Sequence, residues 1–209
     1  MTVTINRPLL GREALMEKSF FALISRMRYI GRWGLMRNSL QENVQEHSHM
    51  VAVLAHALAV IGREIFGKDT NPELCAAAAL YHDASEIITG DLPTPIKYSN
   101  EEIHKSYKAV ELQASRQLLS MLPEKLRGAF SPLIMEEDEE IRRYVKAADK
   151  LSAYIKCIEE RKAGNNEFLS AETQILSALR KNALPELEYF IENFIPAFEL
   201  TLDELETTN

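Results

Sequence analysis

Apolar residues recur along this chain at intervals of three and four, which is the spacing of one face of an α-helix. The clearest stretch runs through Val44, Val51, Leu54 and Ile61. The sequence contains no alternating apolar–polar run of useful length for a strand, no internal repeat and no low-complexity segment. The pattern therefore predicts an all-α fold, built as a bundle of helices.

Glycine and proline mark where these helices should begin and end. Asn71-Pro72 is typical of a helix start, because a capping residue precedes proline in the first turn. Residues 90–95 hold two prolines and should form a rigid loop, and a short helical piece should lie between Pro123 and Pro132. Longer helices are expected over residues 12–30, 42–67, 71–89, 100–121, 136–162, 167–182 and 185–203.

The length of 209 residues suits one domain, or one domain with a helical appendage. We predict an N-terminal extension over residues 1–15 and a single domain with C-terminal helices over residues 16–209. The acidic run at 136–140 suits a solvated helix start, since carboxylates stabilise the positive end of the helix dipole.

Charge and composition narrow the classes of partner. The net charge is -7 and no long basic stripe occurs, which argues against a nucleic-acid polymer. A metal and one or two cations could still hold a small anion. No run approaches the ~20 apolar residues of a membrane span. Cys75 and Cys157 lie in apolar helical contexts outside any CxxC pair, so we expect reduced core thiols and a cytoplasmic protein.

Three short segments carry candidate chemistry. His47 lies on the apolar face of its helix, where a lone histidine is more often a core residue than a ligand. His82 and Asp83 are adjacent, and Glu86 follows His82 by four residues, which places both on one helix face. Asp149 lies among small apolar residues, where it could equally be a hydrogen-bond acceptor or part of an ion pair.

Burial of so many ionisable side chains is costly unless they are paired or bind a metal. Two imidazoles and two carboxylates form a mixed nitrogen and oxygen ligand set. Such a set suits divalent transition ions, Mg²⁺ or Mn²⁺ better than a cysteine-rich structural zinc site. Spacing alone does not prove that the three segments meet.

The order His47, His82-Asp83, Asp149 resembles the HD-domain superfamily of metal-dependent phosphohydrolases. Longer segments are similar to the bacterial 5′-deoxynucleotidases of the YfbR type, and the resemblance covers the chain from about Lys18 onward. These segments are RWGLMRN (32–38), ENVQEHS (42–48), YHDASEIITGDLPTPIKY (81–98), KAADKLSAYIKCIEE (146–160) and AGNNEF (163–168).

The resemblance implies an HD-domain helical bundle with a metal site in its core, a homodimer, and hydrolysis of deoxyribonucleoside 5′-monophosphates to deoxynucleoside and phosphate. It implies one divalent ion per subunit, such as cobalt or manganese. The implied metal ligands are His47, His82, Asp83 and Asp149, of which His47, Asp83 and Asp149 also contact substrate.

The same resemblance assigns roles around the metal. Arg32 would orient the phosphate, and Trp33 would lie against the nucleoside. Glu86 would position or deprotonate the attacking water, and Asp91 would protonate the leaving 5′ oxygen. Residues Leu92, Pro93 and Thr94 would shape the sugar site and exclude a 2′-hydroxyl.

Other interpretations stay open at this point. Arg32 could be a surface cation, Trp33 a core residue and Asp91 a turn former before Leu-Pro. The enzyme could hydrolyse another phosphate, such as a nucleoside triphosphate, a guanosine tetraphosphate alarmone or a cyclic nucleotide. The chain could also be a metal-binding regulatory protein without catalysis. An acid, a base and a phosphate-binding cation together favour the enzyme.

Overall fold

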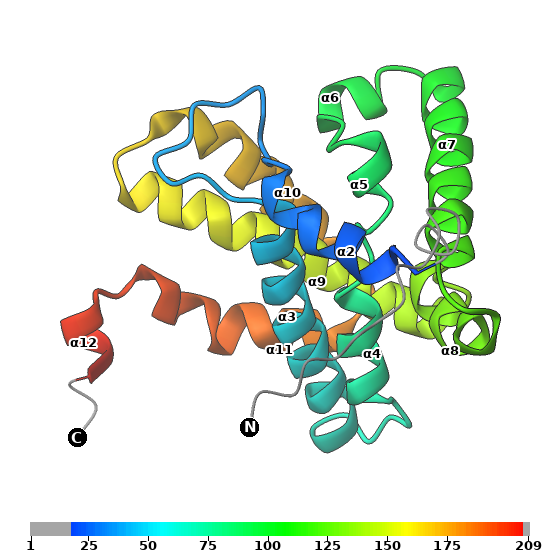
Figure 1. Ribbon diagram of the computed structural model, residues 1–209. Helices are drawn as coiled ribbons and strands as arrows, with labels where there is room; N and C mark the ends of the chain where they lie inside the picture. The colour runs from blue at the N-terminus through cyan, green and yellow to red at the C-terminus, as the bar shows by residue number, and fades with distance from the viewer. Residues whose placement is uncertain (1–17, 207–209) are drawn as a thin grey trace, which may run out of the picture.

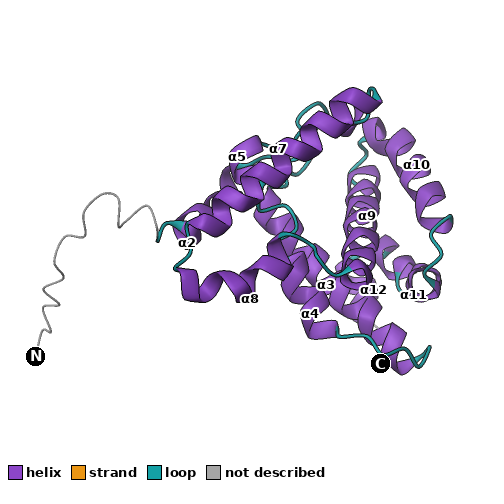
Figure 2. Cartoon of the chain, turned by 90° about the vertical axis from the view of Figure 1, so that its right-hand side faces the viewer, coloured by secondary structure: helices purple, strands orange, loops and turns teal. Residues whose placement is uncertain are grey.

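The computed structural model describes residues 18–206, and this part of the chain is built from helices joined by loops (Figures 1 and 2). Within it no strand forms, and the pairing of Gly31 with Asn43 is an isolated β-bridge. The predicted all-α fold is confirmed. None of the described helices is long and apolar enough to cross a membrane. The predicted N-terminal extension, residues 1–15, lies outside the described residues.

The helices follow one another with short connections. In chain order they are α2 (Phe20–Ile24), the 3-10 helix η1 (Ser25–Tyr29), α3 (Val44–Glu64), α4 (Pro72–Ala79), α5 (Glu86–Thr89), α6 (Thr94–Lys97), α7 (Glu101–Ser120), α8 (Glu124–Ile134), α9 (Glu139–Lys162), η2 (Asn166–Phe168), α10 (Leu169–Arg180), α11 (Pro185–Asn193), η3 (Ile195–Glu199) and α12 (Leu202–Glu206).

The main core lies where α3 packs against α4 and α9, with α11 against α3 (Figure 1). Val51 and Leu58 from α3 meet Leu151 and Ile158 from α9, and all four are fully buried. In a second buried cluster, Phe20 of α2 packs with Leu118 of α7 and Ile134 of α8, and this cluster attaches α2 to the other two helices. Burial of the apolar stripe stabilises these helices, because each buried leucine or valine contributes about 1.5–3 kcal/mol.

Helix α3 follows the sequence pattern closely. The Asn43 side chain accepts hydrogen bonds from the N–H groups of the first turn, and Glu46 Oε2 accepts one from the Asn43 N–H, which completes a capping box. The helix ends at Glu64, and Gly67 beyond it has φ +63, a conformation that glycine adopts without strain. The predicted helix over residues 42–67 is confirmed.

The predicted continuous helix over residues 71–89 is wrong. It stops at Ala79, residues 80–85 form turns, and α5 begins at Glu86. The carbonyl oxygen of Ala79, which a continuing helix would offer to the Asp83 N–H, instead faces His82 Nδ1 at 2.7 Å. The His82 side chain therefore takes the place of a helical hydrogen bond, and the helix ends just before the His82-Asp83 pair.

Proline explains the other differences. The predicted helix over residues 185–203 breaks after Asn193 into η3 and α12, because Pro196 has no N–H to continue it. Residues 94–97, partly inside the predicted rigid loop, form the short helix α6, with Pro95 in its first turn. The helix that was predicted to lie between Pro123 and Pro132 includes Pro132 and ends two residues later, at Ile134.

Candidate metal centre and substrate site

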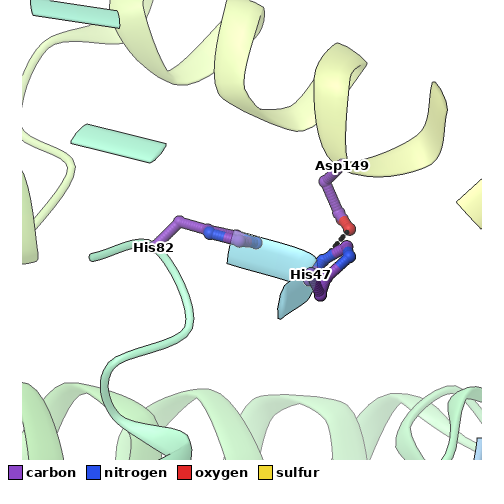
Figure 3. A group of neighbouring side chains, drawn as sticks. All are labelled: His47, His82 and Asp149. Atoms are coloured by element: carbon purple, nitrogen blue, oxygen red, sulfur yellow. Dashed lines mark ion pairs between the residues drawn. The ribbon is translucent and has the colours of Figure 1, made fainter. Parts of the chain in front are cut away.

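Three side chains from distant parts of the chain meet in the core (Figure 3). His47 comes from α3, His82 from the turn after α4, and Asp149 from α9. One ligand atom from each lies within 4.8 Å of the others. His47 Nε2 and Asp149 Oδ1 are 3.1 Å apart. The packing of α3, α4 and α9 thus brings together the three side chains, which their spacing in the sequence alone could not show.

Asp83 adjoins this group. Its Oδ2 lies 3.2 Å from His82 Nε2 and 3.6 Å from His47 Nε2. The same oxygen is 3.4 Å from Arg32 Nη1, so Asp83 links the histidines to the arginine. Burial by itself raises the pKa of the Asp83 carboxyl, but the charges of His82, His47 and Arg32 lower it below its ordinary value. Asp83 is therefore an ionised carboxylate beside the two imidazoles.

The second nitrogens of the histidines are already occupied. His82 Nδ1 faces the Ala79 carbonyl, to which it must donate, and His47 Nδ1 lies 3.2 Å from Ser152 Oγ. In contrast, both Nε2 atoms are buried without a hydrogen-bond partner among the described residues. Metal-binding histidines show this arrangement, in which one nitrogen is fixed by a hydrogen bond and the other is aimed at the ion. The residues present therefore fit a divalent metal.

The charge around His82 supports the same conclusion. Burial lowers the pKa of His82, but the charge of Asp83, whose Oδ2 lies 3.2 Å from His82 Nε2, outweighs burial and raises the pKa to about 9. The pKa of Asp149 is lowered, because the close approach and the charge of His47 outweigh the effect of burial. Carboxylates that favour a proton on His82 Nε2 also favour a metal cation at that position.

Arg32 and Trp33 are held together by a carboxylate that the sequence did not single out. Glu42 Oε2 accepts hydrogen bonds from Arg32 Nε at 3.1 Å and from Trp33 Nε1 at 3.0 Å. The Trp33 ring packs on Phe168, with centroids 5.3 Å apart. Arg32 is mostly buried and reaches Asp83, so it is not a surface cation. The signal for Glu42 was its place in the ENVQEHS segment, where it precedes a helix cap.

The loop that carries Arg32 and Trp33 is anchored to the end of α9. Glu160 is buried and accepts hydrogen bonds from the backbone N–H groups of Ser39 and Leu40. Lys156 donates to Glu160 and to the Leu40 carbonyl, and Asn165 donates to Glu160. This buried network fixes the loop against α9, and with it the position of the Arg-Trp pair.

Two further carboxyl groups flank Asp83. Glu86 is buried, and its Oε2 has no hydrogen-bond partner among the described residues. Burial, then the charges of Asp83 and Asp91, raise the pKa of Glu86 to about 9. Burial also raises the pKa of Asp91, although the charge of Arg32 opposes this. Both groups therefore favour the protonated form more than exposed carboxyls do, which suits groups that transfer protons.

The loop after α5 lies at the edge of the site. Leu92 and Pro93 are half-buried and Thr94 is exposed. Among the described residues, no side-chain hydrogen bond or ion pair joins these three to the metal-binding group. Lys97 pairs with Glu111 at 2.7 Å, which fixes the loop to α7. The predicted sugar-binding role of residues 92–94 therefore stays a prediction.

A cavity of about 740 Å³ opens beside the metal-binding group. His82, Asp83 and Asp149 lie in its wall, together with residues of α7 and α9. Glu136 also lines it, although its place in the acidic run at 136–140 predicts a solvated helix start. That expectation is wrong for Glu136: it is half-buried with φ 48, and burial raises the pKa of its carboxyl. A non-glycine residue in this conformation has no clear sequence signal.

Comparison with known proteins agrees with this geometry. The model of a family described as "5'-deoxynucleotidase YfbR-like" matches residues 19–198. The chain belongs to this family. A 5'-deoxynucleotidase YfbR from Shigella boydii is 52% identical over 191 residues, which covers 90% of this chain and 96% of the relative. The YfbR protein of Escherichia coli K12 is 51% identical over the same coverage.

Solved structures show the same fold at lower identity. An HD-domain phosphohydrolase from Listeria innocua superposes with a TM-score of 0.75 at 22% identity, covering 86% of this chain and 88% of the other. The HD phosphohydrolase DatZ of cyanophage S-2L, bound to dA and one catalytic Zn²⁺, superposes with a TM-score of 0.61 at 20% identity, covering 82% and 93%. This YfbR-like chain therefore has the HD-domain phosphohydrolase fold, as the sequence predicted.

Proposed function

We propose that this protein is a metal-dependent 5′-deoxynucleotidase, which hydrolyses deoxyribonucleoside 5′-monophosphates to deoxynucleoside and phosphate. The observation that carries the proposal is the meeting of His47, His82 and Asp149, which bring one possible ligand atom each to within 4.8 Å of one another, beside Asp83 and Arg32. Membership of the YfbR-like family supports the same activity, since the relatives are named for it. DatZ, with dA and a catalytic Zn²⁺, supports a nucleotide substrate and a divalent metal.

His47, His82, Asp83 and Asp149 would hold the metal in this proposal. When bound, a divalent ion supplies Lewis acidity, which neutralises phosphate charge and acidifies water. Arg32 would bind phosphate oxygens, because its planar guanidinium matches their geometry. The mixed ligand set accepts several ions, and cobalt or manganese are the ions we would supply first.

The two flanking carboxyl groups have different tasks in the proposal. Glu86 has one buried oxygen without a partner among the described residues. A divalent cation held beside Asp83 would lower the pKa of Glu86, so that the ionised carboxylate could orient the attacking water and accept its proton. Asp91 would deliver a proton to the leaving 5′ oxygen. Trp33 would lie against the nucleoside, and residues 92–94 would border the sugar and disfavour a 2′-hydroxyl. Phosphoryl transfer by such a site needs no protein nucleophile.

A phosphate-release assay tests the proposal. Purified full-length protein is given 5′-dAMP, 5′-dTMP or AMP, first with EDTA and then with Co²⁺ or Mn²⁺. Metal-dependent release from the deoxynucleotides and not from AMP is the expected result. Release from none of the monophosphates with any metal would overturn the proposal and leave a metal-binding protein that acts on another phosphate ester or on none.

Glu86→Gln separates an enzyme from a protein that only binds metal. The variant should retain its metal and lose turnover by about 100-fold or more, because a general base typically contributes 10²–10⁴-fold. Glu73→Gln is the matched control, since Glu73 is exposed and lies on the neighbouring helix α4. Full activity of Glu86→Gln would remove Glu86 from the mechanism.

We further propose that the enzyme works as a cytoplasmic homodimer with a single domain over residues 16–209. The homodimer follows from the YfbR-type resemblance. Both cysteines are free and buried, which suits a reducing compartment. Light scattering at several concentrations tests the dimer: a mass of one chain at every concentration would contradict it.

A further inference from the structure

The cavity beside the metal-binding group has an unusual distribution of charge. Arg143, Lys146 and Lys150 line it from α9, and Lys108 lines it from α7. All four side chains are exposed, and none forms an ion pair with another described residue. These unpaired cations occur in a protein whose net charge is -7, so they run against the overall charge of the chain.

The three cations of α9 form one stripe. They are separated by three and four residues, so they project from the same side of the helix. Asp149 follows Lys146 by three residues and therefore lies next to the stripe. The stripe therefore adjoins a predicted metal ligand within the wall of the same cavity.

Most carboxylates that line the cavity already have another partner or another predicted role. Glu111 is paired with Lys97 at 2.7 Å, and Asp83 and Asp149 belong to the predicted metal site. Glu136 remains as the carboxyl group facing the four cations. Partial desolvation at the cavity wall lowers the pKa of the largely exposed Lys146, Glu136 opposes this, and the charges of Arg142, Lys108 and Lys150 lower it further. Like charges therefore repel one another here unless an anion joins them.

We propose that Lys108, Arg143, Lys146 and Lys150 form an entrance that attracts the phosphate group of the substrate and guides it to the metal-binding residues. The ligand class is a phosphate dianion, and the proposal rests on the proposed nucleotidase function. Clefts lined by one sign of charge raise association rates for oppositely charged ligands by about 10–10³-fold at low salt. The cations need not touch the reacting atoms, so their effect should appear in capture and not in chemistry.

The double variant Lys108→Gln with Lys146→Gln tests this entrance. At low ionic strength its kcat/KM for 5′-dAMP, with Mn²⁺, should fall about tenfold, while kcat changes little. Raising the salt should bring the wild type down toward the variant, because ions screen exposed charges beyond about 10 Å at 0.1 M. Lys125→Gln is the matched control: it removes one exposed lysine on α8 that does not line the cavity.

Equal kcat/KM and an equal salt dependence for the double variant and the wild type would overturn the proposal. A second measurement keeps it distinct from the proposed function. If the wild type hydrolyses no nucleotide, the ³¹P line width of inorganic phosphate reports binding to the full-length protein directly. Broadening by the wild type and Lys125→Gln, lost in the double variant, would support a phosphate entrance on an enzyme with another substrate. Identical broadening by all three proteins would reject it.

Discussion

Trp33 donates a hydrogen bond from its indole Nε1 to Glu42 Oε2, at a distance of 3.0 Å. The same oxygen accepts from Arg32 Nε, so one carboxylate holds both residues of the Arg-Trp pair. Trp33 has φ 59, a conformation that costs a non-glycine residue about 1–3 kcal/mol and needs support from its surroundings. Glu42 supplies part of that support, which identifies it as a positioning residue.

Glu42→Ala should therefore raise KM for 5′-dAMP by about tenfold or more, since small misplacements of binding groups are costly. Metal content should be unchanged. Glu42→Gln retains an acceptor oxygen and should recover part of the loss. Glu192→Ala, an exposed position on α11, serves as the control. If Glu42→Ala bound and turned over substrate normally, the Arg-Trp pair would not depend on this carboxylate.

Asp149→Asn should reduce bound metal and activity together. Asparagine keeps the size of the side chain but removes the charge that faces His47 Nε2. Elemental analysis after Mn²⁺ loading and desalting measures the effect, and circular dichroism confirms that the helices remain. Asp69→Asn removes an exposed charge instead and should bind metal like the wild type. Full metal occupancy in Asp149→Asn would exclude Asp149 as a ligand.

The stability of the protein should depend on Glu160 below pH 4.5. Burial raises the pKa of Glu160, but hydrogen bonds from Lys156, Asn165 and Ser39 outweigh it and lower the pKa from 4.5 to about 2. A pKa that is lower in the folded state stabilises the protein above the unfolded value of 4.5. That contribution is lost as the pH falls from 4.5 toward 2.

Glu160→Gln should lower the free energy of unfolding by about 3 kcal/mol at pH 7, because it leaves Lys156 buried without its partner charge. The difference from the wild type should shrink as the pH drops below 4.5. Urea unfolding at pH 7, 4 and 3 gives both values. A difference that stays constant across these pH values would show that the charge of Glu160 is not responsible.

The helices were predictable where local rules act alone. The stripe from Val44 to Ile61 and the Asn71-Pro72 start needed only periodicity and capping, and both appear as expected. The break at His82 was not predictable from propensity, because a side chain there takes the Ala79 carbonyl from the helix. Pro196 indicates a helix break, but the helical spacing of the apolar residues around it favoured a continuous helix.

The site shows a similar division. His47 and Asp149 were recognisable as polar residues on apolar helix faces, but their approach to 3.1 Å depends on how α3 crosses α9. Glu42 was not identified, since its partners are set by a loop whose path is fixed by Glu160 from far along the chain. The sequence therefore indicated which residue types carry the chemistry. The contacts between residues that are far apart along the chain could be established only from the packed structure.

Gly62 is the position where a single methyl group should disturb the core. A Cβ there would lie 2.8 Å from both Glu186 Oε1 and the Tyr144 hydroxyl. Glu186 is fully buried and holds Lys68 at 2.6 Å and Tyr144 at 2.7 Å, so it has little freedom to move. Gly62→Ala should lower the free energy of unfolding by about 1–3 kcal/mol through overpacking.

Gly128→Ala in α8 gives the opposite expectation. A Cβ there meets nothing within 4 Å, so the better helix propensity of alanine should raise the free energy of unfolding by about 0.5–1 kcal/mol. The two substitutions are chemically identical and both lie in helices, which isolates the effect of the Glu186 cluster. Urea unfolding of both variants therefore yields opposite signs if the cluster is rigid. Stabilisation by both would mean that Glu186 and Tyr144 can move apart without loss.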